Sequence, residues 1–183
     1  MLRTNLLFIH VISALALATA LGIEAVALNQ LRRVTDGASA RAALATLDAS
    51  RRVGGLGVLL LLLSGLGLAS AYWHWKGAWI GLGLAGMVGI GAMAGVMTGR
   101  RVSLLRRRLG EGALGSALTE ALPALRASFV IRGALLAGIV YLMTVKPGPL
   151  VSLGALGIAV IAGLILGRAR TSAAPLQATR AQG

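Results

Sequence analysis

Few side chains in this sequence are able to carry chemistry, and most of them stand inside apolar runs. His10 lies in the run NLLFIHVISA, Glu24 lies further along the same apolar stretch, and Arg132 interrupts a later one. His74 stands between two tryptophans. Burying an ionisable side chain in an apolar segment is costly, so each of these residues is a candidate for a functional role.

Glu24 and Arg132 are the first candidates for a pair. Glu24 lies about one helical turn from the end of its run, and Arg132 lies about one turn into another run, at a similar depth. A carboxylate and a guanidinium are each costly alone at that depth and much cheaper together. We therefore predict an intramembrane ion pair between them. Two alternatives remain open, because Glu24 has Arg33 nearby and an intramembrane carboxylate also serves as a proton carrier.

The two histidines suggest a second kind of site. Along the chain, His10, His74 and Met143 all fall near the same side of the predicted bundle. Two imidazoles on facing helices suit the axial positions of haem iron, and histidine with methionine suits haem or copper. This pattern raises the hypothesis of a haem b or metal site that uses His10 with His74 or Met143. The alternative is that His10 only hydrogen-bonds a neighbouring helix or relays protons.

Other catalytic patterns are missing from the sequence. It has no phosphate-binding GxxxxGK loop, no GxSxG turn and no cysteine, and it contains only five acidic residues. Hydrolytic or phosphoryl-transfer catalysis therefore has few candidate residues in this chain. We expect a non-enzymatic membrane protein with an accessory or structural role. The alternatives are a haem b or metal-binding redox protein using His10 and a small proton-coupled transporter using Glu24 and Arg132.

The composition places these residues in a membrane protein. The chain is 57% hydrophobic and 13% charged, whereas a soluble domain carries about 25% charged residues. Five apolar runs approach the length of about 20 residues that a membrane-spanning helix needs. They cover residues 6–28, 53–72, 78–98, 129–145 and 150–167. We predict an all-α polytopic bundle of about five transmembrane helices over residues 1–168, followed by a flexible cytoplasmic tail at 169–183.

The positive charges predict the orientation of this bundle. They gather in the gap after the first run, in the gap after the third run and in the tail: Arg32, Arg33, Arg41, Arg51, Arg52, Arg100, Arg101, Arg106, Arg107, Arg108, Arg126, Arg168, Arg170 and Arg180. The opposite side holds only Arg3, Lys76 and Lys146. Loops rich in lysine and arginine stay cytoplasmic, so we predict that the amino terminus is outside and the protein is multi-pass in a bacterial cytoplasmic (inner) membrane. This placement explains the net charge of +13 without a nucleic-acid partner.

The amino-terminal run also has features of a signal peptide, because Arg3 precedes it and it contains small residues such as ALATA. More basic residues follow the run than precede it, and the run is long for a signal peptide. We therefore interpret it as an uncleaved first span.

Two segments predict contacts with lipid or with a second copy. In RRVSLLRRRL, residues 100–109, the side chains of Val102, Leu105 and Leu109 share one helical face. Such a segment is able to lie on the membrane and bind anionic lipid headgroups at the inner face, at about 1 kcal/mol per basic residue. The alternative is a short helix that serves only as a topology signal.

The third span is rich in glycine, and Gly91, Gly95 and Gly99 follow a four-residue spacing, as do Gly77 and Gly81. Small residues at that spacing allow helices to approach closely. The spacing fits either packing within one chain or a homo-oligomer formed through this span.

A cluster of aromatic residues marks the outer ends of the second and third spans. It consists of Tyr72, Trp73, Trp75 and Trp79. Aromatic side chains are enriched where a helix meets the membrane surface, so we expect these to anchor the bundle there.

The chain also resembles known membrane proteins. The stretch FIHVISALALATALGIEAVALNQLRR, with MTGRR and YLMTVKPG later on, resembles a group of uncharacterised bacterial integral membrane proteins over most of the chain. More distantly, the early histidine is similar to that in the first helix of CopD-like copper-resistance proteins and HemJ-like protoporphyrinogen oxidases. In the HemJ-like family this histidine binds haem b, which implies the same role for His10. His74 and Lys76 are candidates for the second ligand by position only.

Overall fold

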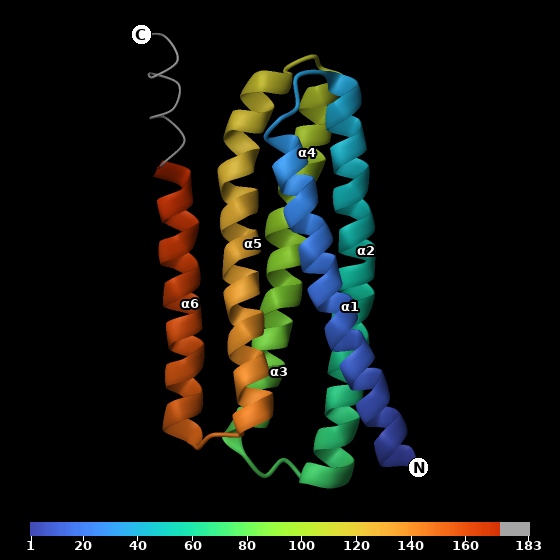
Figure 1. Cartoon of the computed structure of the whole chain (residues 1–183), viewed down its shortest axis with the longest axis vertical. Helices are drawn as coiled ribbons and strands as arrows, with labels where there is room; N and C mark the ends of the chain where they lie inside the picture. The colour runs from blue at the N-terminus through green and yellow to red at the C-terminus, as the bar shows by residue number, and fades with distance from the viewer. Residues whose placement is uncertain (173–183) are drawn as a thin grey trace.

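The protein consists of long helices that lie side by side, as Figure 1 shows for a computed structural model that describes residues 1–172. The elements are α1 (Leu2–Leu31), α2 (Gly37–Leu68), the π-helical segment η1 (Ala69–Trp73), α3 (Ala78–Ala92), the π-helical segment η2 (Met93–Thr98), α4 (Gly99–Gly110), α5 (Leu114–Val145) and α6 (Pro149–Ser172). The segment η1 continues α2 without a break, and α3, η2 and α4 form one continuous helix. No strand occurs within the described residues, so the all-α prediction is confirmed.

Judged by length and composition, five continuous helices within the described residues are long and apolar enough to cross a membrane. They are Leu2–Leu31, Gly37–Trp73, Ala78–Gly110, Leu114–Val145 and Pro149–Arg168. Each predicted apolar run falls inside one of them, which confirms five candidate spans. The type of membrane and the side on which each end lies remain predictions.

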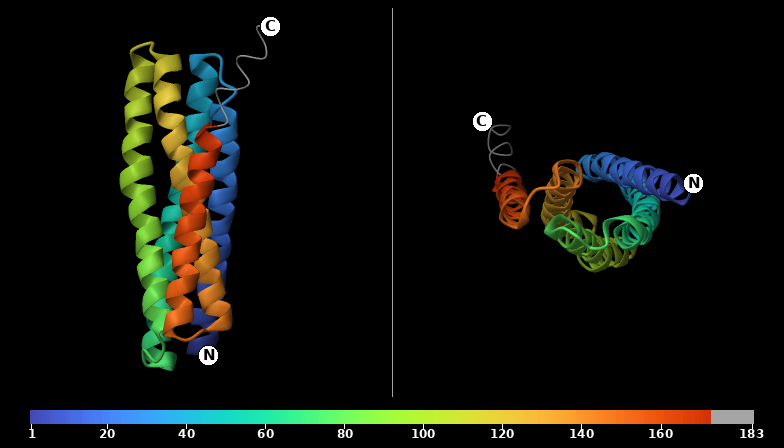
Figure 2. Two further views of the ribbon diagram at one scale, coloured as in Figure 1. Left: turned by 90° about the vertical axis from the view of Figure 1, so that its left-hand side faces the viewer. Right: turned by 90° about the horizontal axis from the view of Figure 1, so that it is seen from below.

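Four of the long helices form a ring, and the fifth lies outside it. Seen along its axis in Figure 2, helices α1, α2, α3 and α5 surround a common centre. Helix α6 lies outside the ring, where it packs mainly against α5. The pairs α1 with α2 and α5 with α6 make the most extensive contacts, and the members of each pair are consecutive in the chain.

The two ends of the bundle differ in chemistry, and we name them for their residues. The α1–α2 and α4–α5 turns lie at the arginine end, and the α2–α3 and α5–α6 turns lie at the tryptophan end (Figure 1). At the arginine end, the Asp36 side chain caps α2 by accepting hydrogen bonds from the backbone N–H groups of Ala38 and Ser39. The hydrogen bond from the Ser39 backbone also lowers the pKa of the Asp36 carboxyl.

Helices at the arginine end continue beyond the length that a membrane requires. Helix α5 has 32 residues, which at 1.5 Å per residue span about 48 Å, against a hydrocarbon core of about 30 Å. The extensions enclose an apolar core of their own. It consists of Ala27, Leu28, Leu31, Ala43, Leu44, Leu47, Val102, Leu105, Ala117, Leu118, Ala121 and Leu125.

The apolar core at the arginine end changes the interpretation of the segment RRVSLLRRRL. Val102 and Leu105 are 2% and 1% exposed, so their shared face packs into the bundle and is not available to lie on a membrane. Two of the arginines around this face form ion pairs with neighbouring helices. Arg106 forms an ion pair with Asp48, and Arg108 Nη1 lies 2.7 Å from Glu120 Oε2. Binding of anionic lipid by the arginines stays a prediction.

Contacts at the tryptophan end join the two turns there. The rings of Trp73 and Trp79 meet edge to face with centroids 5.2 Å apart, and Lys146 Nζ lies 4.3 Å from the Trp73 centroid. Trp79 is 8% exposed, so it belongs to the core, whereas Trp75 is 50% exposed and fits the predicted role at the membrane surface.

The carboxyl-terminal boundary differs slightly from the prediction. Helix α6 continues to Ser172, so the helical part ends later than residue 168. The rest of the predicted tail, residues 173–183, lies outside the described residues.

We predict that Leu47→Ala weakens the bundle at the arginine end. Leu47 is fully buried, and removing a buried leucine side chain costs about 2–5 kcal/mol through lost burial and the cavity left behind. The free energy of unfolding in mixed micelles measures this. Leu59→Ala on the same helix is the control, because Leu59 is 53% exposed. Equal losses in the two variants would contradict a protein core at this end.

Candidate functional site

The predicted ion pair between Glu24 and Arg132 is present in the interior of the ring. Arg132 Nη2 donates to Glu24 Oε1, and the two side chains are 5% and 3% exposed, respectively. Arg132 Nε also donates to the backbone carbonyl of Ser128, at 3.3 Å. The pair connects α1 with α5, two helices whose residues are far apart in the sequence.

Hydroxyl groups beside the pair hold the surrounding helices together. Ser50 Oγ donates to the Ala20 carbonyl at 2.6 Å, which joins α2 to α1. Thr98 Oγ1 lies 3.2 Å from Ser128 Oγ, which joins η2 to α5. All four helices of the ring therefore have a polar contact within a turn or so of the ion pair.

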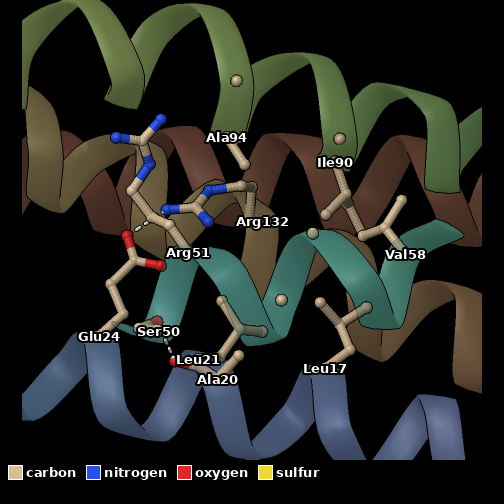
Figure 3. A pocket seen from close by; sticks show the side chains of 14 residues that line it. Leu17, Ala20, Leu21, Glu24, Ser50, Arg51, Val58, Ile90, Ala94 and Arg132 are labelled. Carbon is tan, nitrogen blue, oxygen red and sulfur yellow. Dashed lines mark hydrogen bonds and ion pairs between the residues drawn. The ribbon is translucent and has the colours of Figure 1, made fainter. Parts of the chain in front are cut away.

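Arg51 is a third charged residue at this place (Figure 3). Its side chain is 32% exposed, and its Nη1 lies 4.0 Å from Asp48 Oδ1. Its other terminal nitrogen lies so close to Gly99 that a Cβ at this position would be 2.8 Å away. Gly99 thus makes room for the Arg51 guanidinium.

A cavity of about 290 Å³ lies beside these charges. Leu17, Ala20, Leu21, Glu24, Ser50, Arg51, Gly54, Gly55, Val58, Ile90, Gly91, Ala94, Gly95 and Arg132 line it. Figure 3 shows Glu24, Arg51 and Arg132 together at one end and Leu17, Val58 and Ile90 at the other. Arg132 pairs with Glu24, and Asp48 lies beside both Arg51 and Arg106. This group of three arginines and two carboxylates has an excess of one positive charge.

Two glycines of the four-residue pattern line this cavity. A Cβ at Gly91 would lie 3.4 Å from Val58 Cγ1, and a Cβ at Gly95 would meet nothing within 4 Å. Close helix packing occurs instead at Gly83 and Gly86, where Met143 and Ile139 of α5 occupy the space of a side chain. A homo-oligomer formed through this span stays a prediction.

His10 packs against α2. Its Nδ1 lies 3.1 Å from Ser64 Oγ, and Ser64 Oγ donates to the Leu60 carbonyl at 2.6 Å. Since the serine proton is used in that second bond, the consistent arrangement has His10 Nδ1–H as the donor to Ser64. This tautomer leaves the lone pair on Nε2, the nitrogen that a metal or haem iron would take.

The other two predicted ligands have different partners. His74 ends η1 in the left-handed conformation, with its Nδ1 3.3 Å from the Ser70 carbonyl oxygen. Met143 packs with Trp79 and Ile80 at the tryptophan end. Lys76 is exposed in the α2–α3 turn. Within residues 1–172, no three histidine, aspartate or glutamate side chains are grouped to hold a metal ion.

Sequence reasoning identified the ion pair but missed Arg51 and the cavity. From the sequence alone, Arg51 is one of several arginines that predict the orientation of the bundle. Arg51 differs from Arg52 in its position on α2. It follows Ser50 and has the spacing of one helical face with Gly54 and Val58, and all of these residues line the cavity. That spacing was the available signal.

Comparisons with known proteins do not identify this chain. No protein-family model matches it, and neither a curated protein nor a solved structure matches it significantly. The resemblance to CopD-like and HemJ-like proteins therefore remains a prediction.

We predict that the two members of the ion pair depend on each other for stability. Glu24→Gln or Arg132→Gln alone leaves one charge buried without its partner, which costs about 3–5 kcal/mol. The double variant removes both charges and should recover most of that loss. Free energies of unfolding for the four proteins in mixed micelles complete the cycle. Two single variants as stable as the starting protein would exclude a stabilising pair.

The haem hypothesis for His10 has a direct test. If His10 is a ligand, protein purified from haem-replete cells in mild detergent will show a Soret band, and His10→Ala will abolish it. Ser64→Ala is the matched control, because it removes the hydrogen bond of His10 but keeps the imidazole. A colourless, metal-free protein would leave His10 as a packing residue on α2.

Proposed function

We propose that this chain is a small, non-enzymatic membrane carrier that binds an anionic ligand in its central cavity. The observation that carries the proposal is the buried Glu24–Arg132 pair at the wall of a cavity that also holds Arg51. A pair with a purely structural role needs no space beside it. Here the space lies next to an excess of positive charge, which favours an anion.

The pair also provides a way to take up and release such a ligand. When Glu24 accepts a proton, Arg132 loses its carboxylate partner, and the ligand anion takes that place. One proton and one negative charge then enter together, so the cavity keeps its net charge. This exchange corresponds to the proton-coupled carrier among the three functions that the sequence suggests.

Packing around the cavity supports a carrier that is closed on one side. Toward the tryptophan end, the space is followed by a cluster of Leu17, Leu61, Met87, Ile90, Leu135 and Ile139. A further cluster of Ala69, Trp79, Ile80 and Leu142 lies beyond it. The polar groups lie on the other side, toward the arginine end. A binding site that reaches only one side at a time is the arrangement that a carrier needs.

The accessory and redox functions have less support from this geometry. An accessory protein needs no charged cavity, and His10 lies away from it on α1, hydrogen-bonded to Ser64. We therefore place the function at the ion pair.

Reaction of an introduced cysteine tests for an anion site without knowledge of the ligand. The chain contains no cysteine, so Ala94→Cys places a single thiol in the cavity wall. We expect an anionic methanethiosulfonate (the ethylsulfonate) to react faster than the cationic ethyltrimethylammonium reagent. The rate ratio should exceed that of free N-acetylcysteine by roughly tenfold or more, because a charged cleft concentrates the opposite ion.

Two neighbouring arginines provide the control. Arg51→Gln in the Ala94→Cys protein should lower the preference for the anionic reagent. Arg52→Gln should leave it nearly unchanged, because Arg52 does not line the cavity. Glu24→Gln, where it folds, should raise the preference. Equal effects of the two arginine variants, or no preference at all, would refute the anion site and favour the accessory function.

A further inference from the structure

We propose that the ligand is an amphiphile with one acidic headgroup and a hydrocarbon chain, and that it enters from the bilayer between α2 and α3. This inference rests on the proposed function and names its ligand class. It goes further because it specifies the route and the shape of the molecule as well as its charge.

The cavity has the two ends that such a molecule requires. Arg51 and Arg132 supply guanidinium groups at one end, which bind a carboxylate or a phosphate in a forked arrangement. Leu17, Val58 and Ile90 form an apolar wall at the other end, as Figure 3 shows. A small inorganic anion would use only the first end.

The side of the cavity between α2 and α3 is open. Gly55 on α2 and Gly95 on η2 both line the cavity, both are exposed, and a Cβ on either would meet nothing within 4 Å. Helices α2 and α3 also contact each other less than α1 and α2 do. The missing side chains thus leave a gap in the wall of the ring.

Residues beside this gap face hydrocarbon. Leu56 follows Gly55 and is 58% exposed, and Val96 follows Gly95 and is 51% exposed. Large exposed apolar side chains in a membrane-spanning segment contact lipid chains. The gap therefore opens toward the bilayer interior, where a hydrocarbon chain is soluble and a free inorganic ion is not.

The volume of the cavity sets the part of the ligand that fits. About 290 Å³ is at the lower limit of the roughly 300–1,000 Å³ that small-molecule sites occupy. A headgroup and the start of one chain fill such a space. The rest of the chain would pass between Gly55 and Gly95 and lie along the outside of the ring.

Protection of the thiol in Ala94→Cys protein, in nanodiscs of uncharged lipid, tests this proposal. Palmitate is the probe, acetate has the same headgroup without the chain, and hexadecanol has the chain without the charge. At a palmitate concentration about ten times its Kd, mass action predicts modification by the anionic reagent roughly tenfold slower. Acetate and hexadecanol at the same concentration should protect much less.

Leucine substitutions test the route. Gly55→Leu should fill the gap and abolish protection by palmitate. Gly22→Leu is the matched control, because Gly22 is an exposed glycine of α1 with nothing near its Cβ position, and it does not line the cavity. Gly95→Leu and Gly81→Leu form a second such pair. The rate with Ser116→Cys, on the exposed surface of α5, corrects for charge that palmitate adds to the bilayer.

The outcomes separate this inference from the function on which it rests. Protection by acetate equal to that by palmitate would identify a free anion as the ligand, and equal protection by hexadecanol would remove the role of the headgroup. Either result overturns the amphiphile and leaves the Arg51-dependent reagent preference intact. Palmitate protection that survives Gly55→Leu and Gly95→Leu overturns the route. Loss of the reagent preference itself would overturn both proposals.

Discussion

The buried pair of Glu24 and Arg132 is the constraint from which the arrangement of the bundle follows. Almost every other residue of α1 within the membrane is apolar, so hydrophobicity alone does not choose which face of the helix turns inward. Glu24 does choose it, because a carboxylate facing lipid without a partner is too costly. Leu17 and Ala20 lie on the same helical face as Glu24 and are buried, whereas Leu15 and Val26 point away and are more than half exposed.

The buried residues of helix α2 follow two patterns, one expected for a helix in water and one expected for a helix in lipid. Near the arginine end, Leu44 and Leu47 are buried, as they would be in a water-soluble bundle. Further along the same helix the pattern reverses, because Leu59 and Leu63 are exposed while Ser64 is buried. Because lipid is as apolar as leucine, moving a leucine from lipid into the protein interior gains no hydrophobic free energy. Small and polar residues occupy the interior instead. The change occurs near Arg51 and Arg52.

The number of spans and the ion pair were predictable from sequence because each follows from a single large energy term. Twenty apolar residues are needed to cross hydrocarbon, and the lone acidic residue within them needs a cation. The helical extensions were not predictable in the same way, since RRVSLLRRRL looks alike whether its apolar face meets a membrane or a core. The cavity was hidden for another reason. Gly86 and Gly95 are the same residue type, and only the distance to the next helix shows that one packs and the other leaves space.

The space beside the ion pair has a physical reason in the chemistry of arginine. A guanidinium carries five N–H donors, and the recorded contacts of Arg132 use its Nε and Nη2 groups, toward Ser128 and Glu24. No buried side-chain nitrogen or oxygen within residues 1–168 is left without a partner, so the other donors of Arg132 are not sealed in the core, and Arg132 lines the cavity. Filling that cavity with a leucine side chain would leave these N–H groups of Arg132 buried without an acceptor, at a cost of about 1–3 kcal/mol or more for a charged group. The small residues around it, Ala20, Gly91 and Ala94 among them, keep this space open, and it is the space that the proposed anion would occupy.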